Sequence, residues 1–171
     1  VSSCWDVHTF VVPLLGYERG LSASQIGVVL GTFAMAAFVI RLLLPTISRS
    51  FKEMTVVMAA MVLTSAVFAI YPLMPNALMM TACSALLGIA LGSVQPMAMS
   101  MLHQITPEDR HGEAVGLRLM MINASSVAMP LMFGAAGAAI GVTGVFWVMG
   151  GMIGAGSRLA WTLGRMPIPS F

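Results

Sequence analysis

Long apolar stretches separated by short polar breaks make up almost the whole chain. A helix that crosses a bilayer needs about 20 mostly apolar residues, and charge, glycine or proline commonly marks its ends. Six stretches fit this pattern, at about 1–15, 23–44, 54–71, 77–102, 114–140 and 142–163. The first is short for a complete span, which indicates a chain cut inside that helix. We therefore predict an all-α fold, a polytopic transmembrane helix bundle of about six spans with the first one truncated.

Several of the predicted helix ends carry local signals. Ser22 immediately precedes the second stretch, and Gln25 lies three residues after Ser22, which predicts a capping box. Pro45 marks the expected end of that helix. The turn at 72–76 is so short that the third and fourth helices should be antiparallel neighbours. Within the polar stretch 105–113, Thr106-Pro107-Glu108-Asp109 reads as an N-cap, a first-turn proline and an acidic first turn. This signature predicts a short interfacial helix between the fourth and fifth spans.

Small residues recur inside the apolar stretches. In lipid, glycine and alanine allow two helix backbones to approach closely, so their positions predict helix contacts. We expect such contacts at Gly27, Gly31, Ala34, Gly88, Gly92, Gly134, Gly137, Gly141, Gly150, Gly151 and Gly154.

Composition excludes the soluble classes of protein. The chain is 58% apolar and 8% charged, whereas an average soluble domain is about 25% charged. Its mean hydropathy is +0.94, so the lipid bilayer is the expected environment. The net charge of +2 includes no basic run that could grip a phosphate backbone, so we expect no nucleic-acid partner. Cys4 and Cys83 lie in apolar stretches without a histidine cluster, which predicts small buried side chains and neither metal nor cofactor.

The basic residues indicate the orientation in the membrane. Cytoplasmic loops carry an excess of Lys and Arg, and of the 8 basic residues only Arg19 falls on one side. The other side holds Arg41, Arg49, Lys52, Arg110, Arg118, Arg158 and Arg165. We therefore predict that the C-terminus is cytoplasmic. The preference for Arg over Lys and the abundance of Ala and Gly are typical of a GC-rich bacterial genome, so the predicted location is a bacterial inner membrane.

Two ionisable residues fall inside the first predicted helix. Such groups are costly in a membrane, so each is a functional candidate. Asp6 should lie near the bilayer midplane, where its carboxyl group can either exchange protons or make a structural hydrogen bond. His8 is either a proton relay or substrate donor, or a neutral histidine bonded between helices. Because two residues turn a helix by about 200°, Asp6 and His8 should point apart, whereas Trp5 and His8 should share a face.

Other polar residues interrupt the later helices. Gln95 precedes Pro96, which should bend the fourth helix, and it either contacts substrate or bonds a neighbouring helix. Asn123 lies midway through the fifth span with Ser125 and Ser126 after it, and interhelical hydrogen bonding is the expected role. Arg41 and Arg118 are near enough to the cytoplasmic interface to reach it with their long side chains.

The topology and one motif resemble a known family. The segment Pro107-Glu108-Asp109-Arg110-His111-Gly112-Glu113-Ala114-Val115-Gly116, followed by Pro130 and Gly134, is similar to the loop between the tenth and eleventh helices of major facilitator superfamily transporters. The loop at 45–52 departs from the family's basic motif, with Ser48 and Phe51 where an acidic residue and a glycine are expected. The resemblance implies that residues 1–171 are the C-terminal half of such a transporter, with the N-terminal half missing. It also implies that the first and fourth helices line the central cavity, which favours Asp6, His8 and Gln95.

A transporter is therefore the leading functional hypothesis. The resemblance implies a secondary active transporter that moves a small solute across the cytoplasmic membrane by alternating access, and we expect proton coupling through Asp6. Its expected partners are the bilayer, the solute, protons and the missing half. Anchoring or gating at the cytoplasmic side is the expected role of Arg41, Arg49, Arg110 and Arg118. Two alternatives are a non-transporting scaffold and a self-contained intramembrane enzyme. We expect no enzyme, because the sequence has neither a Gly-x-Ser-x-Gly elbow nor a His-Glu-x-x-His zinc motif.

Overall fold

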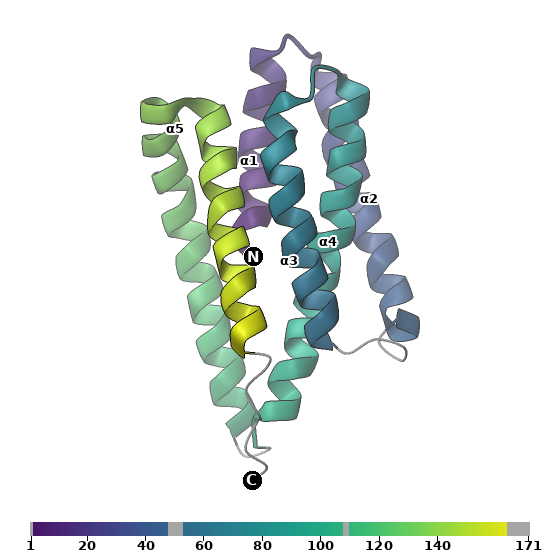
Figure 1. Ribbon diagram of the computed structural model, residues 1–171, viewed down its shortest axis with the longest axis vertical. Coiled ribbons are helices and arrows are strands. Elements are labelled where there is room, and N and C mark those ends of the chain that lie inside the picture. Colours follow the sequence, from purple (N-terminus) through teal and green to yellow (C-terminus); the bar gives the residue numbers. More distant parts are fainter. Residues whose placement is uncertain (1, 48–52, 108–109, 164–171) are drawn as a thin grey trace.

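Helices joined by short links run up and down the molecule in the computed structural model (Figure 1), which describes residues 2–47, 53–107 and 110–163. Their order is α1 (Ser2–Glu18), α2 (Ala23–Ile47), α3 (Glu53–Ile70), the 3₁₀ turn η1 (Tyr71–Leu73), α4 (Ala77–Ile105) and α5 (His111–Leu163). Gly141 interrupts α5 with φ 73° and ψ 167°, so that α5 consists of two antiparallel segments, 111–140 and 141–163. The described residues therefore form six helical segments, which confirms the predicted all-α bundle.

Local signals in the sequence account for several helix ends. The capping box is confirmed, because the Ser22 backbone N–H donates to Gln25 Oε1 at 2.9 Å and the Gln25 N–H donates to Ser22 Oγ at 3.3 Å. The turn before α4 is confirmed as well. The expected end of α2 at Pro45 is wrong, because the helix continues to Ile47. A proline inside a helix removes its own N–H donor and crowds the carbonyl group four residues earlier, but the residues after it can stay helical.

The link between α4 and α5 is described in part. Thr106 closes α4 as its C-cap, with its N–H donating to the Leu102 carbonyl at 3.1 Å. The His111 ring then lies 2.6 Å from the Thr106 carbonyl oxygen, at the point where α5 begins. Glu108 and Asp109, the centre of the short interfacial helix expected here, lie outside the described residues, while the Arg110 N–H donates to the Pro107 carbonyl at 3.0 Å, as in a helical turn.

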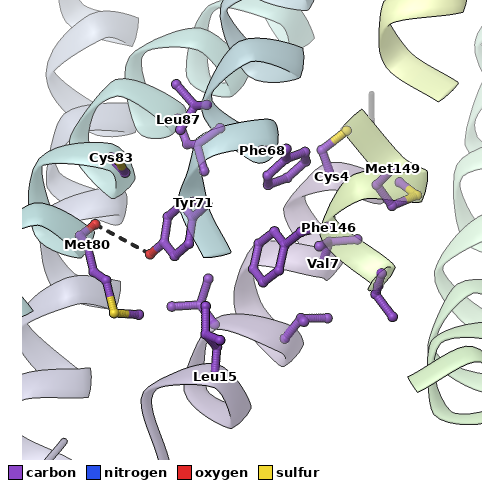
Figure 2. Packing of buried hydrophobic residues seen from close by; sticks show 14 of the residues in the cluster. Cys4, Val7, Leu15, Phe68, Tyr71, Met80, Cys83, Leu87, Phe146 and Met149 are labelled. Carbon is purple, nitrogen blue, oxygen red and sulfur yellow. Dashed lines mark hydrogen bonds between the residues drawn. The ribbon is translucent and has the colours of Figure 1, made fainter. Parts of the chain in front are cut away.

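An aromatic core holds α1, α3, α4 and the second segment of α5 together (Figure 2). Tyr71 stacks on Phe146 with ring centroids 5.1 Å apart, and Phe68 meets the same ring edge-on at 5.6 Å. Cys4 and Cys83 are buried and unbonded, as their apolar surroundings predicted. Because these rings come from segments far apart in the sequence, their burial fixes how the helices pack.

The outside of the bundle is covered by large apolar side chains. Leu78 is 81% exposed and Leu131 is 73% exposed, a surface that suits lipid rather than water. By length and composition, α2, α3 and α4 can each cross a membrane, over Ala23–Thr46, Glu53–Leu73 and Ala77–Gln104. In the second segment of α5, Gly141–Ser157 is a shorter apolar helix.

Glycines bring particular helix pairs into close contact. A Cβ atom at Gly88 would lie 2.4 Å from the Phe33 carbonyl oxygen, and one at Gly92 would lie 2.8 Å from Ala37 Cα, so α4 packs tightly on α2. Gly154 lies similarly against Ser65 of α3. The prediction is wrong for five other glycines, which have no such atom within 4 Å in the described chain: Gly27, Gly31, Gly134, Gly141 and Gly151.

Candidate functional site: a polar hollow between four helical segments

A hollow of about 560 Å³ opens where α1, α2, α4 and the first segment of α5 meet. Its lining combines charged, amide, hydroxyl and apolar groups, from Trp5, Asp6, Arg41, Gln95, Pro96, Ile122 and Ser126. A second hollow of about 270 Å³ shares Trp5, Gln95 and Ile122 with the first and adds Arg118. The two hollows therefore adjoin, and together they gather three of the expected basic and acidic residues.

Asp6 enters the hollow from α1. Its carboxylate accepts a hydrogen bond from Ser126 Oγ at 3.4 Å. Ser126 stands halfway along the first segment of α5, between His111 and the break at Gly141, so the carboxylate lies at about the middle depth of that segment. The side chain of Asp6 is half-buried. Asp6 is thus an ionisable group within the bundle's depth, and Ser126 is its one hydrogen-bond partner among the residues that the structure describes.

The two arginines turn towards the hollow rather than only towards the helix ends. The guanidinium carbon of Arg41 lies 5.5 Å from the centre of the Trp5 ring, a cation–π contact between α2 and α1. Arg118 donates to Gln95 Oε1 at 2.8 Å and contacts Met99 Sδ at 3.4 Å. The Trp5 ring of α1 and the Gln95 amide of α4 are therefore partners of these arginines inside the bundle, while anchoring at the cytoplasmic interface stays a prediction.

Gln95 takes part in both hollows. Pro96 lies inside α4, which continues past it to Ile105. The Gln95 carbonyl oxygen also lies 3.5 Å from an Arg118 nitrogen, so the same guanidinium contacts the side chain and the main chain of one residue. Gln95 therefore bonds a neighbouring helix and also faces the hollow, while substrate contact stays a prediction.

His8 points away from the hollow. Its side chain is fully buried, with Nε2 2.9 Å from Ser84 Oγ and the ring stacked on Phe33 at 4.0 Å. Trp5 also contacts Phe33, with centroids 4.7 Å apart, so Trp5 and His8 share a face as predicted. Asp6 and His8 diverge, also as predicted. The position of His8 favours the structural alternative, a histidine hydrogen-bonded between α1 and α4.

The remaining candidates lie elsewhere. Asn123 is exposed and does not line the hollow, whereas Ser126, one turn further along, does. Arg110 pairs with Glu113 at 3.4 Å, and both side chains are largely exposed. Arg49 lies outside the described residues. Among the residues that the structure describes, no group of three His, Cys, Asp or Glu side chains could hold a metal ion.

Sequence reasoning gave too little weight to Trp5 and Ser126. Ser126 was expected only to make interhelical hydrogen bonds, which its bond to Asp6 confirms, and Trp5 was expected only to share a face with His8. The spacing of Ile122 and Ser126 by one helical turn was the available signal, because residues four apart share a face of a helix.

The fold and the hollow define a polytopic membrane protein with charged groups at depth in an apolar bundle. A family model for the Major Facilitator Superfamily matches residues 2–170, so the chain belongs to this family of membrane transporters. A comparison with curated proteins gives no match.

Proposed function

We propose that the protein is a secondary active transporter that moves a small solute across a bacterial inner membrane by alternating access. In this proposal residues 1–171 supply the C-terminal half, and the polar hollow is this half's share of the solute path. The supporting observation is the hollow itself, where Asp6, Arg41 and Gln95 converge among helices that are otherwise apolar. Charged side chains at membrane depth usually mark ion or substrate pathways, because their desolvation is costly.

The elements around the hollow support a two-halved arrangement. Transporters of this kind bind solute between two helical halves, near the middle of the membrane. The hollow opens to one side of the bundle, and it draws on α1, α2, α4 and the first segment of α5. The aromatic core also involves α1 and α4, but its other helical segments, α3 and the second segment of α5, line neither polar hollow except through Val57. A second half placed over the open side would enclose the solute.

Asp6 is the proposed site of proton coupling. A carboxyl group can gain and lose a proton as its surroundings change between the two orientations of the transporter. Ser126 can donate to the charged carboxylate and can accept from the protonated form, so both states keep a partner. We further propose that the C-terminus is cytoplasmic, with the end of the bundle that carries Arg110 on that side.

Thiol accessibility in the full-length protein tests alternating access without knowledge of the solute. Ser126→Cys and Ile122→Cys place a thiol in the hollow, and a membrane-impermeant thiol reagent is applied to intact cells and to inverted vesicles. We expect labelling from both sides, because the hollow would open to each in turn. Unmodified protein gives the background, since Cys4 and Cys83 are buried.

Met152→Cys, on the second segment of α5, is the control, with a side chain that is 60% exposed on the outer surface and no place in the hollow. It should stay unlabelled from either side, because lipid would cover it. Labelling of both hollow positions from one side only would contradict alternating access.

A further inference from the structure

The guanidinium groups in the two hollows have only uncharged partners. Arg41 lies over the Trp5 ring, and Arg118 contacts an amide oxygen, a carbonyl oxygen and a thioether sulfur. The one ion pair among the described residues joins Arg110 to Glu113. Thioether sulfur is a weak acceptor, and a guanidinium has five N–H donors in a planar fork. Arg41 and Arg118 therefore keep donors that a stronger acceptor can use.

The charge of the hollows is unbalanced. Arg41 and Arg118 contribute two positive charges and Asp6 contributes one negative charge, and the Asp6 carboxylate is bonded to Ser126 rather than to either arginine. His8, the other titratable group on this part of α1, is turned towards Ser84. An uncompensated charge is costly where water is scarce, so a bound anion would relieve it.

From this geometry we infer that the transported solute is a small organic monoanion, a carboxylate with an apolar body. The inference rests on the proposed function, because it takes the hollow to be the solute path. A guanidinium fork matches the two oxygens of one carboxylate, and the excess of positive charge favours an anion whether or not Asp6 carries a proton. Trp5, Pro96 and Ile122 supply an apolar wall for the rest of the molecule. A volume of about 560 Å³ suits a solute of this size.

A cationic solute fits the same hollow less well. It would meet one carboxylate and two guanidinium groups, so like-charge repulsion would oppose its binding. Proton coupling also follows for an anion. A proton on Asp6 removes the one negative charge that faces the carboxylate, so proton and anion would favour each other's binding by the same factor. The groups that line the hollows around Asp6, where the proton would bind, are Arg41 from α2, Gln95 from α4, and Arg118 and Ser126 from α5.

Protection from labelling tests the class of solute. In full-length protein carrying Ile122→Cys, the rate of thiol labelling is measured with benzoate, hexanoate, benzamide, benzylammonium or hexylammonium present. At least one of the two carboxylates should slow labelling, whereas the neutral amide and the two ammonium ions should not. Either Arg41→Gln or Arg118→Gln should raise the carboxylate concentration needed for protection by about tenfold or more, as expected for losing a charged hydrogen bond.

Two further variants separate charge from folding. Arg41→Lys keeps the positive charge, so a carboxylate should protect this variant better than it protects Arg41→Gln. Arg19→Gln removes an arginine from the opposite end of the bundle, and the carboxylate concentration needed for protection should stay within about twofold of the parent's. If an Arg→Gln variant fails to fold, the comparison of probes in the parent decides alone. Protection by an ammonium ion, or by none of the five probes, would overturn the anion inference and leave the transporter proposal standing. Labelling from only one side of the membrane would instead contradict the transporter proposal.

Discussion

The close contact between α2 and α4 can be tested at Gly88. Replacing Gly88 with alanine adds one methyl group, whose carbon would lie 2.4 Å from the Phe33 carbonyl oxygen and 2.8 Å from Ala36 Cβ. Ordinary contacts between carbon atoms are about 3.5–4.0 Å, so the two helices must separate by about 1 Å. The carbonyl belongs to the backbone and cannot rotate away. Forcing extra volume into a packed contact costs about 1–3 kcal/mol, and the better helix propensity of alanine returns at most about 1 kcal/mol.

Unfolding in mixed micelles of dodecyl maltoside and SDS measures this difference. Gly88→Ala should lower the free energy of unfolding by about 1–2 kcal/mol relative to the parent protein. Gly151→Ala is the matched control, because Gly151 is helical and a Cβ atom there would meet nothing within 4 Å. The control should unfold at the parent's SDS fraction or slightly above it. Equal stability of the two variants would refute a backbone contact between α2 and α4 as close as this one.

Three other predictions follow from the site and the core. Asp6→Asn keeps the size of the side chain but cannot carry a proton, so proteoliposomes should retain solute exchange and lose accumulation driven by a pH gradient; Glu18→Gln is the control, and uphill accumulation by the Asn variant would remove Asp6 from the coupling site. Ser84→Ala takes a partner from both His8 and Tyr71, and it should lower the free energy of unfolding by about 1–3 kcal/mol in mixed micelles; no change would mean that these groups find other partners. Gly141→Ala forces a side chain into a conformation that suits glycine, so stability measured in the same way should fall by about 1–3 kcal/mol, and an unchanged value would contradict the break in α5.

Helix ends show how far local sequence can be trusted in this chain. The capping box of Ser22 and Gln25 forms because both partners lie within one turn of the same helix. Thr106 also reads as a cap from local sequence, and in the structure it is the C-cap of α4, while Glu108 and Asp109 of the expected helix lie outside the described residues. The His111 ring binds the Thr106 carbonyl group, and that contact comes from the following helix. A local signal was reliable where its partners were local.

The sequence by itself determined the membrane class, the number of helical segments and their up-and-down order. Hydropathy and length decide these features, because a bilayer imposes the same minimum span on every helix. The sequence also determined that Asp6 and His8 diverge, since the turn per residue within one helix is fixed. The same reasoning applies to Trp5 and His8, which share a face.

Only the tertiary structure decided which polar groups meet. The rotation of a helix about its own axis depends on its neighbours, and here α4 is set against α2 by Gly88 and Gly92. That packing is compatible with Arg41 and Gln95 lining one hollow, while the aromatic core around Tyr71 encloses the face of α1 that carries His8. Periodicity places side chains around one helix, but contacts between helices decide which of those faces becomes a core and which becomes a cavity.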